Sequence, residues 1–242
     1  MALLLKNGAI FLHVPKTGGS WVTKVLEEQG LVKRRICHIH ADLDRIYRYK
    51  YLGKILRSEL SQVVKPYFST SWKIALKKQY PTGTKLTSEL PFIFCFVRNP
   101  IDWYLSFYRY MVLEGWPRLG DSRHPTDWHP CSDLNELPNE TFDLFIDSLQ
   151  QIYPGFLTSM YSKYTDPRIS FVGKQETLVD DLITVLRHLN LTFDEDQIRT
   201  TRVVNQSNRI LPAEIICNKF HRKTVYETEY AVFKKFGYRI DT

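Results

Sequence analysis

The chain has 242 residues, 43% of them hydrophobic, which predicts one globular domain over residues 1–242 with a full apolar core. Lysine and arginine number 33 against 26 aspartates and glutamates, and the resulting net charge of +7 favours an anionic ligand. No apolar run is long enough to span a membrane and residues 2–5 are too short for a signal-peptide core, which excludes stable membrane insertion and indicates a cytoplasmic protein, or the excised domain of an anchored one.

Strand-like apolar runs alternate with amphipathic helical patterns along the chain. Three strand–helix pairs are predicted, namely 9–14 with 18–29, 92–97 with 100–113, and 169–172 with 177–190. Further helices are predicted at 42–65, at 142–152 with Thr141 as N-cap, and at 212–236, whereas 114–140 has no period and indicates a long loop. The alternation predicts an α/β fold, a parallel sheet with helices on both faces.

The first strand runs directly into a loop suited to an anion. The segment Pro15-Lys-Thr-Gly-Gly-Ser20 follows the apolar run and precedes the first helix. Glycines let backbone N–H groups turn toward a ligand, and the helix start adds the positive end of its dipole, so the loop favours phosphate or sulfate. Lys16 precedes Gly18 and Gly19, unlike the lysine of a Walker A loop. The alternative is an ordinary strand–helix turn, which uses glycines in the same way.

The second strand ends in a further set of anion ligands. Arg98 follows the apolar run 92–97, at the edge where ligands collect in open α/β sheets. Pro100 is suited to start a helix, and Ser106 lies about two helical turns further along it. A guanidinium fork and a hydroxyl group suit one phosphate, so the segment is interpreted as a second anion site.

Metal and nucleic-acid ligands find little support in the sequence. The four cysteines are widely spaced and form no C-x-x-C pair, which argues against a zinc site and a disulfide scaffold; they are Cys37, Cys95, Cys131 and Cys217. The basic cluster at residues 33–35 is too short for a nucleic-acid surface, and no nucleic-acid-binding motif is visible. We therefore expect no metal and no nucleic acid as ligand.

Taken in order, the two segments resemble the cofactor motifs of the sulfotransferase family, which uses 3′-phosphoadenosine-5′-phosphosulfate (PAPS). Residues 15–20 are similar to the loop that holds the 5′-phosphosulfate, and the segment Arg98-x-Pro-x-Asp-x3-Ser-x-Tyr108 to the one that holds the 3′-phosphate. The likeness continues at residues 171–181 and 205–209 and is closest to the carbohydrate-modifying, membrane-type branch, here as a bacterial-like single domain.

Parts of the chain depart from that pattern. Trp103 and Tyr110 stand where the family often carries arginine and histidine, and residues 42–90 and 114–140 match no family motif. The segment around Glu176 and Asp181 is a signature in relatives, and we interpret these two carboxylates as helix-capping and internal salt-bridging groups.

The resemblance implies both fold and activity. The implied fold is a P-loop-kinase-like parallel sheet of four or five strands. The implied enzyme is a PAPS-dependent sulfotransferase that moves a sulfuryl group to an acceptor hydroxyl, with a glycan as the expected acceptor, 3′-phosphoadenosine-5′-phosphate (PAP) as product and no metal. The implied cofactor-binding residues are Lys16, Thr17, Gly18, Gly19, Ser20, Trp21, Arg98, Ser106, Ser207 and Arg209.

Two catalytic roles follow. Lys16 is expected to stabilise charge on the departing oxygen. The base is expected to be His40 and then His38, because the H-x-H spacing resembles the histidine pair of uronyl 2-O-sulfotransferases. A carboxylate base, Asp42 or Asp44, is the rival, and two surface histidines in a basic loop are the plainer alternative. Other histidines carry no assigned role: His13 is interpreted as a core residue, and His124 and His129 lie in the long loop.

Other classes of protein remain open. A small-molecule kinase with a degenerate P-loop would fit the strand–loop–helix pattern but not the place of the lysine. A non-catalytic binding module could retain the PAPS fold for partner recognition. Within the enzyme class, a lipid, a peptide tyrosine and a small metabolite are the alternative acceptors to a glycan.

Overall fold

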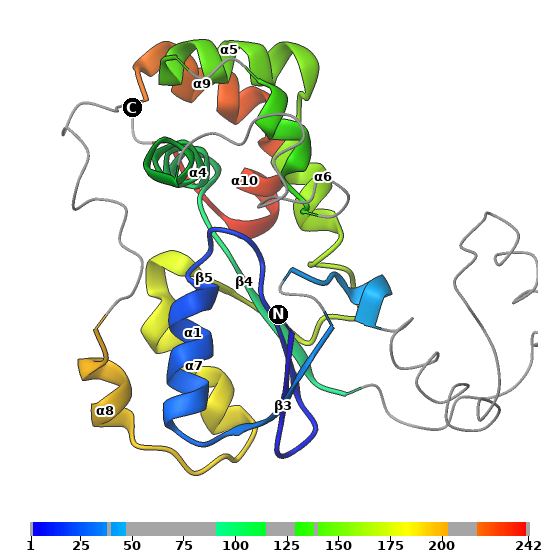
Figure 1. Cartoon of the computed structure of the whole chain (residues 1–242), viewed down its shortest axis with the longest axis vertical. Helices are drawn as coiled ribbons and strands as arrows, with labels where there is room; N and C mark the ends of the chain where they lie inside the picture. The colour runs from blue at the N-terminus through cyan, green and yellow to red at the C-terminus, as the bar shows by residue number, and fades with distance from the viewer. Residues whose placement is uncertain are drawn as a thin grey trace, which may run out of the picture.

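The structure is a computed structural model that describes residues 2–37, 40–46, 91–114, 129–137, 140–202 and 217–240. These residues form an α/β fold around a five-stranded mixed sheet of order β3-β1-β2-β4-β5 (Figure 1). The strands are β1 (Ala2–Leu5), β2 (Ile10–Leu12), β3 (Val32–Ile36), β4 (Ile93–Val97) and β5 (Phe171–Lys174). The α/β class and the strand number match the expectation from sequence.

The expectation of a purely parallel sheet is wrong, because β1 runs against its neighbours. β2 pairs in parallel with β4, and β4 with β5, but β1 is antiparallel to both β2 and β3. A tight turn at Asn7-Gly8 joins β1 to β2, with Gly8 at φ 92° and the Asn7 side chain accepting the Ala9 N–H at 3.1 Å. Asn-Gly is a strong hairpin signal, which the prediction of one strand over 9–14 overlooked.

Strand β3 was also absent from the predicted elements. Its central residues, Lys33, Arg34 and Arg35, are exposed and charged, so they carry no apolar alternation. The strand lies at the edge of the sheet, where charged residues discourage pairing with another chain. Because β3 opposes β1, it runs in the same direction as β2, and its end leads the chain toward residue 40 at the carboxyl edge of the sheet.

Eight α-helices are described, and each lies near a predicted one or in a segment without a prediction. They are α1 (Gly19–Glu28), α4 (Pro100–Glu114), α5 (Phe142–Ile152), α6 (Phe156–Ser162), α7 (Leu178–His188), α8 (Glu195–Thr200), α9 (Lys219–Thr228) and α10 (Tyr230–Phe236). The Thr141 side chain accepts the Leu144 N–H at 3.2 Å, which confirms the N-cap of α5. The final helix is two helices, and most of 42–65 and 114–140 lies outside the described residues.

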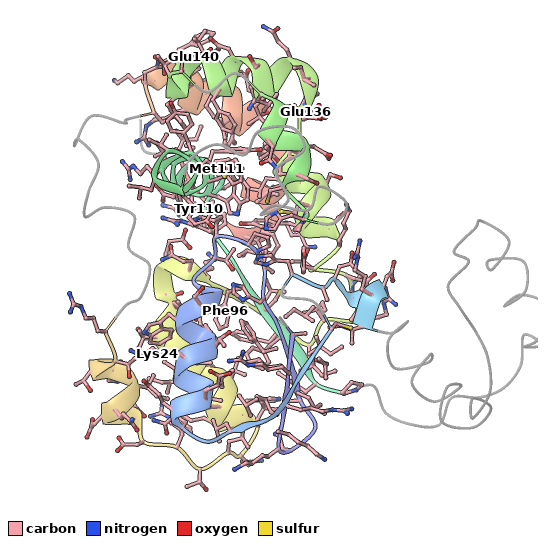
Figure 2. The ribbon with its side chains drawn as sticks, in the orientation of Figure 1. Lys24, Phe96, Tyr110, Met111, Glu136 and Glu140 are labelled. Atoms are coloured by element: carbon pink, nitrogen blue, oxygen red, sulfur yellow. The ribbon has the colours of Figure 1, made fainter. Side chains whose placement is uncertain are left out.

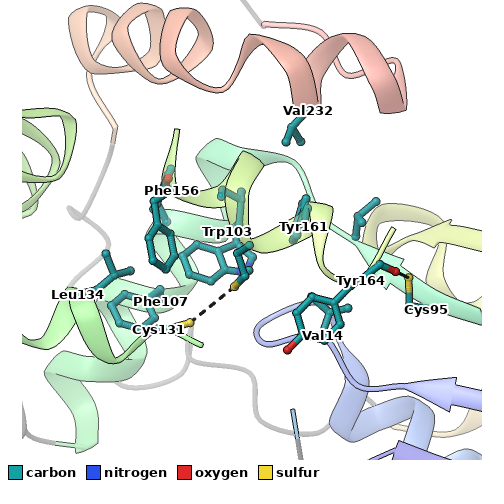
Figure 3. Packing of buried hydrophobic residues seen from close by; sticks show 14 of the residues in the cluster. Val14, Cys95, Trp103, Phe107, Cys131, Leu134, Phe156, Tyr161, Tyr164 and Val232 are labelled. Atoms are coloured by element: carbon teal, nitrogen blue, oxygen red, sulfur yellow. Dashed lines mark hydrogen bonds between the residues drawn. The ribbon is translucent and has the colours of Figure 1, made fainter. Parts of the chain in front are cut away.

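Both faces of the sheet pack against helices, as predicted. Phe11, Phe94 and Phe96 share one apolar cluster with residues of α1 and α7. Leu12 and Cys95, which alternate with them, belong to a second cluster with residues of α4, α5, α6, α9 and α10, part of which Figure 3 shows. None of the helices in the described ranges combines the length and apolar character needed to cross a membrane.

A buried carboxylate joins three of the helical segments. Glu229, between α9 and α10, has no exposed surface. Its Oε1 accepts the Tyr104 hydroxyl of α4 at 2.5 Å and the Leu157 N–H at 3.0 Å. Its Oε2 accepts both the N–H and the hydroxyl of Thr158, each at 2.7 Å. All four partners are donors, so only a group that accepts through both oxygens satisfies them.

We therefore expect Glu229→Gln to lower the free energy of unfolding by about 2–5 kcal/mol, because the new amide NH₂ faces donors in a buried site. Urea unfolding followed by circular dichroism measures this loss. Glu227→Gln is the matched control, since that glutamate is exposed on α9, and it should change stability by less than about 0.5 kcal/mol. Equal stability of the two variants would show that Glu229 does not join these helices.

Candidate functional site

The loop between β2 and α1 presents a row of backbone N–H groups. Lys16 and Gly18 have left-handed backbone angles, with φ of 61° and 81°, and the Thr17 hydroxyl donates to the Val14 carbonyl at 3.0 Å. Within the described part of the chain, the N–H groups of residues 17–20 donate to no protein acceptor. Four adjacent donors at the start of a ten-residue helix favour an anion.

The two glycines of this loop are required by close packing. A Cβ on Gly19 would lie 2.1 Å from Cδ2 of His13, and a Cβ on Gly18 would lie 2.5 Å from Cδ2 of Leu178. The loop therefore lies directly on the buried His13 ring and on the start of α7. Because both glycines are closely packed, the loop has a defined conformation, which argues against an ordinary strand–helix turn that uses glycine only for backbone freedom.

Helix α4 holds the loop from the other side. The buried Trp103 indole donates to the Pro15 carbonyl at 2.8 Å, and Nη1 of Arg98 donates to the Lys16 carbonyl at 3.4 Å. Trp103 is the residue that departs from the family pattern, and its place in this structure gives it a clear role. Trp103 fixes the end of the loop next to β2, and Arg98 places a guanidinium beside the loop.

Arg98 is prepared for an anionic partner. The Tyr161 hydroxyl bonds to both the N–H and the carbonyl of Arg98, at 3.0 and 3.1 Å, which fixes its backbone. Its Nε is buried without a hydrogen-bond partner, burial lowers the pKa of its guanidinium, and no described carboxylate forms an ion pair with it. A bound phosphate would satisfy both the charge and the orphaned donor.

Ser106 lies on α4 two turns beyond the start of the helix and is half-buried. Its hydroxyl bonds to no other described residue. The start of α4 is fixed separately: the Asn99 N–H donates to Oε1 of Glu176 at 2.7 Å, and the Asn99 side chain accepts the Ile101 N–H at 2.9 Å. Oδ2 of Asp181 accepts the Lys174 N–H at 2.7 Å. Glu176 and Asp181 thus make internal hydrogen bonds to backbone N–H groups and hydroxyls, whereas the salt bridges predicted for them are not found among the described residues.

The side chain of Lys16 extends toward α4. Its Nζ lies 4.0 Å from the centre of the Tyr110 ring, which is 39% exposed and is labelled in Figure 2 below Met111. An ammonium over an aromatic face is attracted by the ring quadrupole. Tyr110, the second departure from the family pattern, therefore contacts the lysine expected to act in catalysis.

Three histidines stack beside the loop. The His40 ring lies edge-to-face against His13 at 4.9 Å and against His129 at 4.8 Å between ring centres. The Tyr164 hydroxyl donates to the His40 carbonyl at 2.5 Å and holds that residue in place. His129, for which the sequence offered no position, is thus brought to the site by residues 129–137. In the described ranges, no three His, Cys, Asp or Glu side chains are arranged to hold a metal ion.

Hydrogen bonds decide which imidazole nitrogens carry protons. Nδ1 of His40 faces the His13 carbonyl at 3.0 Å, and because a carbonyl only accepts, this nitrogen carries the proton and Nε2 keeps its lone pair. Nδ1 of His129 accepts the Cys131 N–H at 3.1 Å, which places its proton on Nε2. His40 is therefore the histidine of this pair with a nitrogen free to accept a proton.

The rival carboxylate bases are engaged elsewhere. Oδ1 of Asp42 accepts the Arg45 N–H at 2.9 Å, and Asp44 lies 3.4 Å from Arg168, which also pairs with Asp166 at 2.7 Å. These residues line a separate cavity of about 370 Å³ to which no residue of the glycine loop contributes. The arrangement favours His40 over either aspartate.

One described residue of the expected set, Trp21, does not join this group, and three others cannot be placed. His38, Ser207 and Arg209 lie outside the described residues. Trp21 is buried, its indole donates to the Thr201 carbonyl at 3.2 Å, and its N–H donates to the Gly18 carbonyl at 3.0 Å. The Trp21 side chain links the end of α8 to α1. Both N–H groups of Trp21 are thus already bonded within the protein and do not face a ligand.

The described geometry gathers two cations and a neutral imidazole around a glycine loop at the carboxyl edge of an α/β sheet, a combination suited to an anionic ligand. Comparisons of the chain with protein-family models, with curated proteins and with solved structures found no match. The chemistry of the site is therefore inferred from its own residues. Trp103, Tyr110 and His129 are the additions that the structure makes, and the sequence assigned none of them a role in the site.

The histidine stack makes stability depend on pH. Burial lowers the pKa of His13 to about 3; burial first, and then the neighbouring imidazoles of His13 and His129, lower that of His40 to about 2. Both values lie below the ordinary pKa of 6.5, so the unfolded chain binds these protons first. The contribution of the two neutral rings to the free energy of unfolding is complete above about pH 6.5. It is lost as the pH falls, by at most about 1.4 kcal/mol per pH unit for each histidine.

We expect His40→Gln to make the loss of unfolding free energy between pH 6 and 4.5 shallower by about 1 kcal/mol per pH unit. Urea unfolding at several pH values measures the slope. His188→Gln, at an exposed histidine at the end of α7, is the control and should keep the slope of the original protein. An unchanged slope in His40→Gln would mean that this imidazole is not held neutral in the folded protein.

Proposed function

We propose that this protein is a PAPS-dependent sulfotransferase that transfers a sulfuryl group to an acceptor hydroxyl. The observation that carries the proposal is the junction of Arg98 with the glycine loop, where Nη1 of Arg98 bonds to the Lys16 carbonyl at 3.4 Å. Two anion-binding elements from different strands thereby meet at one edge of the sheet. A nucleotide with one phosphate group at its 5′ end and another at its 3′ position requires such a pair of elements.

The residues present fit PAPS in their chemistry. The N–H groups of residues 17–20 suit the 5′-phosphate, since they are directed donors at a helix start. Arg98, with its buried and unpartnered Nε, and the Ser106 hydroxyl suit the 3′-phosphate. When bound, PAPS supplies the sulfuryl group that is transferred. A P-loop-kinase-like relation of the fold belongs to the same proposal.

Lys16 supplies electrostatic stabilisation in this proposal. Its ammonium lies over the Tyr110 ring of α4 and can neutralise negative charge that develops on the oxygen between phosphorus and sulfur. Transfer reactions of this type ask the protein mainly for positioning and charge stabilisation. The backbone of Lys16 is positioned by Arg98 and by its own left-handed conformation.

His40 supplies the base. Its Nε2 holds a lone pair because Nδ1 is committed to the His13 carbonyl, and its low pKa keeps the ring neutral at physiological pH. A bound polyanion beside the loop raises this pKa, because negative charge favours the imidazolium form. The ring would then accept the proton of the acceptor hydroxyl more readily.

A glycan hydroxyl is the acceptor that we propose. The net charge of +7 favours a polyanionic polysaccharide, and Tyr110 and His129 offer exposed ring surface beside the loop. Amphipathic ring faces are suited to contact with sugars. The proposed site of action in the cell is the cytoplasm.

The first test is binding of PAP, with 5′-AMP, ADP and ATP–Mg²⁺ as comparison ligands. At one hundred times its dissociation constant, PAP should stabilise the folded protein by about 2.7 kcal/mol and raise the melting temperature by roughly 5–10 °C. Arg98→Ala should weaken PAP binding roughly 10- to 100-fold in calorimetry, because a charged hydrogen-bond donor is lost. Arg34→Ala, which removes the same charge from exposed β3, should bind like the original protein.

The comparison ligands distinguish the proposed function from the kinase and binding-module alternatives. Stabilisation by ATP–Mg²⁺ in place of PAP would overturn the proposal in favour of the kinase alternative. No response to any of the nucleotides would favour the non-catalytic binding module. Equal PAP affinity in Arg98→Ala and Arg34→Ala would overturn the assignment of Arg98 to the 3′-phosphate.

The second test concerns turnover. Lys16→Met removes the charge and keeps much of the volume, so we expect the rate of transfer to fall about 10²- to 10³-fold while the fold persists. The measurement is transfer of labelled sulfate from PAPS to desulfated heparin, hyaluronan and dextran, together with release of PAP. Lys33→Ala on β3 is the control with an equal charge change. A Lys16→Met variant that transfers at the original rate would remove Lys16 from the mechanism.

A further inference from the structure

The proposed function assigns no role to the contact between Lys16 and Tyr110. Nζ of Lys16 lies 4.0 Å from the centre of the Tyr110 ring, within the range of an attractive cation–π contact. Tyr110 comes from α4, the same helix that holds the loop through Trp103. The contact thus joins the expected catalytic ammonium to the element that already positions its backbone.

The backbone contacts of Lys16 do not determine where its ammonium lies. The carbonyl is held by Arg98, but the side chain has four rotatable carbon bonds and about 2 kcal/mol of rotamer entropy. The ring of Tyr110 is a second, distal support that selects one direction of the side chain. Catalysis by charge stabilisation depends on such preorganisation, because the cation must already stand where charge develops.

An aromatic face is also a chemically suitable support at this place. A carboxylate partner would neutralise the lysine and repel an incoming polyanion, whereas a tyrosine ring holds the ammonium through its quadrupole and adds no net charge. Tyr110 is 39% exposed, so the contact between its ring and the ammonium lies near the protein surface.

We propose that Tyr110 is a positioning residue of the site, whose ring holds the Lys16 ammonium at the mouth of the glycine loop in the direction needed for transfer. The proposal rests on the proposed function, since it assigns the lysine its task in sulfuryl transfer. It predicts that the ring is needed and that the hydroxyl is not. Tyr110→Phe should therefore retain the behaviour of the original protein, and Tyr110→Leu should lose it.

The first arm of the test detects the contact without reference to activity. Lysines are reductively methylated with ¹³C-formaldehyde, and the Lys16 methyl resonance is assigned by its absence in Lys16→Arg. Ring current should move this resonance upfield in the original protein and in Tyr110→Phe, and the shift should be lost in Tyr110→Leu. Tyr230→Leu, at a half-exposed tyrosine of α10, is the matched control and should leave the resonance unchanged.

The second arm measures PAPS turnover, as release of PAP with water or desulfated heparin as acceptor. We expect kcat to fall at least about tenfold in Tyr110→Leu, with the KM for PAPS and the affinity for PAP changed less than about threefold, because the ring directs the cation and does not bind the nucleotide. Tyr110→Phe should stay within about twofold of the original kcat, as should Tyr230→Leu. A merely structural role would lower stability in Tyr110→Leu without this split between kcat and KM.

The two arms separate the possible failures. An upfield resonance together with an unchanged kcat in Tyr110→Leu would overturn the positioning role and leave the proposed function standing. A resonance without ring-current shift in the original protein would overturn the contact itself. Absence of turnover and of PAP binding in the original protein would overturn the proposed function, and with it the task assigned to Tyr110, whatever the resonance shows.

Discussion

The parallel pairing of β2 with β4 is the constraint on which the site depends. Its register sets Ile10 opposite Ile93 and Leu12 opposite Cys95, so both strands end at the same edge of the sheet. The chain that leaves β2 there forms the glycine loop, and the chain that leaves β4 begins with Arg98. Groups more than eighty positions apart in the sequence thereby come within hydrogen-bond distance.

Helix α4 converts this proximity into a defined shape. Two residues of α4, and Arg98 two positions before it, contact successive groups of the loop: Trp103 the Pro15 carbonyl, Arg98 the Lys16 carbonyl, and Tyr110 the Lys16 ammonium. From the opposite side, the loop rests on the buried ring of His13. A loop held on both sides keeps its N–H groups directed at one place, which is what recognition of an anion requires.

The charges of the site are balanced in an unusual way for a protein interior. Arg98 has a buried Nε without a partner, and the neighbouring stack of imidazoles is held neutral by burial. The fold thus places a cation where desolvation disfavours it and supplies no described carboxylate as an ion-pair partner. Such an arrangement is costly for a protein alone and becomes favourable when a phosphate or sulfate is bound.

The sequence by itself determined the α/β class, the three strand–helix pairs, the Thr141 cap and the place of the glycine loop and of Arg98 at strand ends, because apolar periodicity and glycine, proline and arginine positions are local signals. Only the tertiary structure decided the direction of β1, the edge strand β3, and the contacts of Trp103, Tyr110 and His129. Antiparallel pairing and side-chain contacts between distant segments depend on which elements become neighbours in space. No local pattern carries that information, so the role of an aromatic residue such as Tyr110 becomes clear only when its neighbour in space is known.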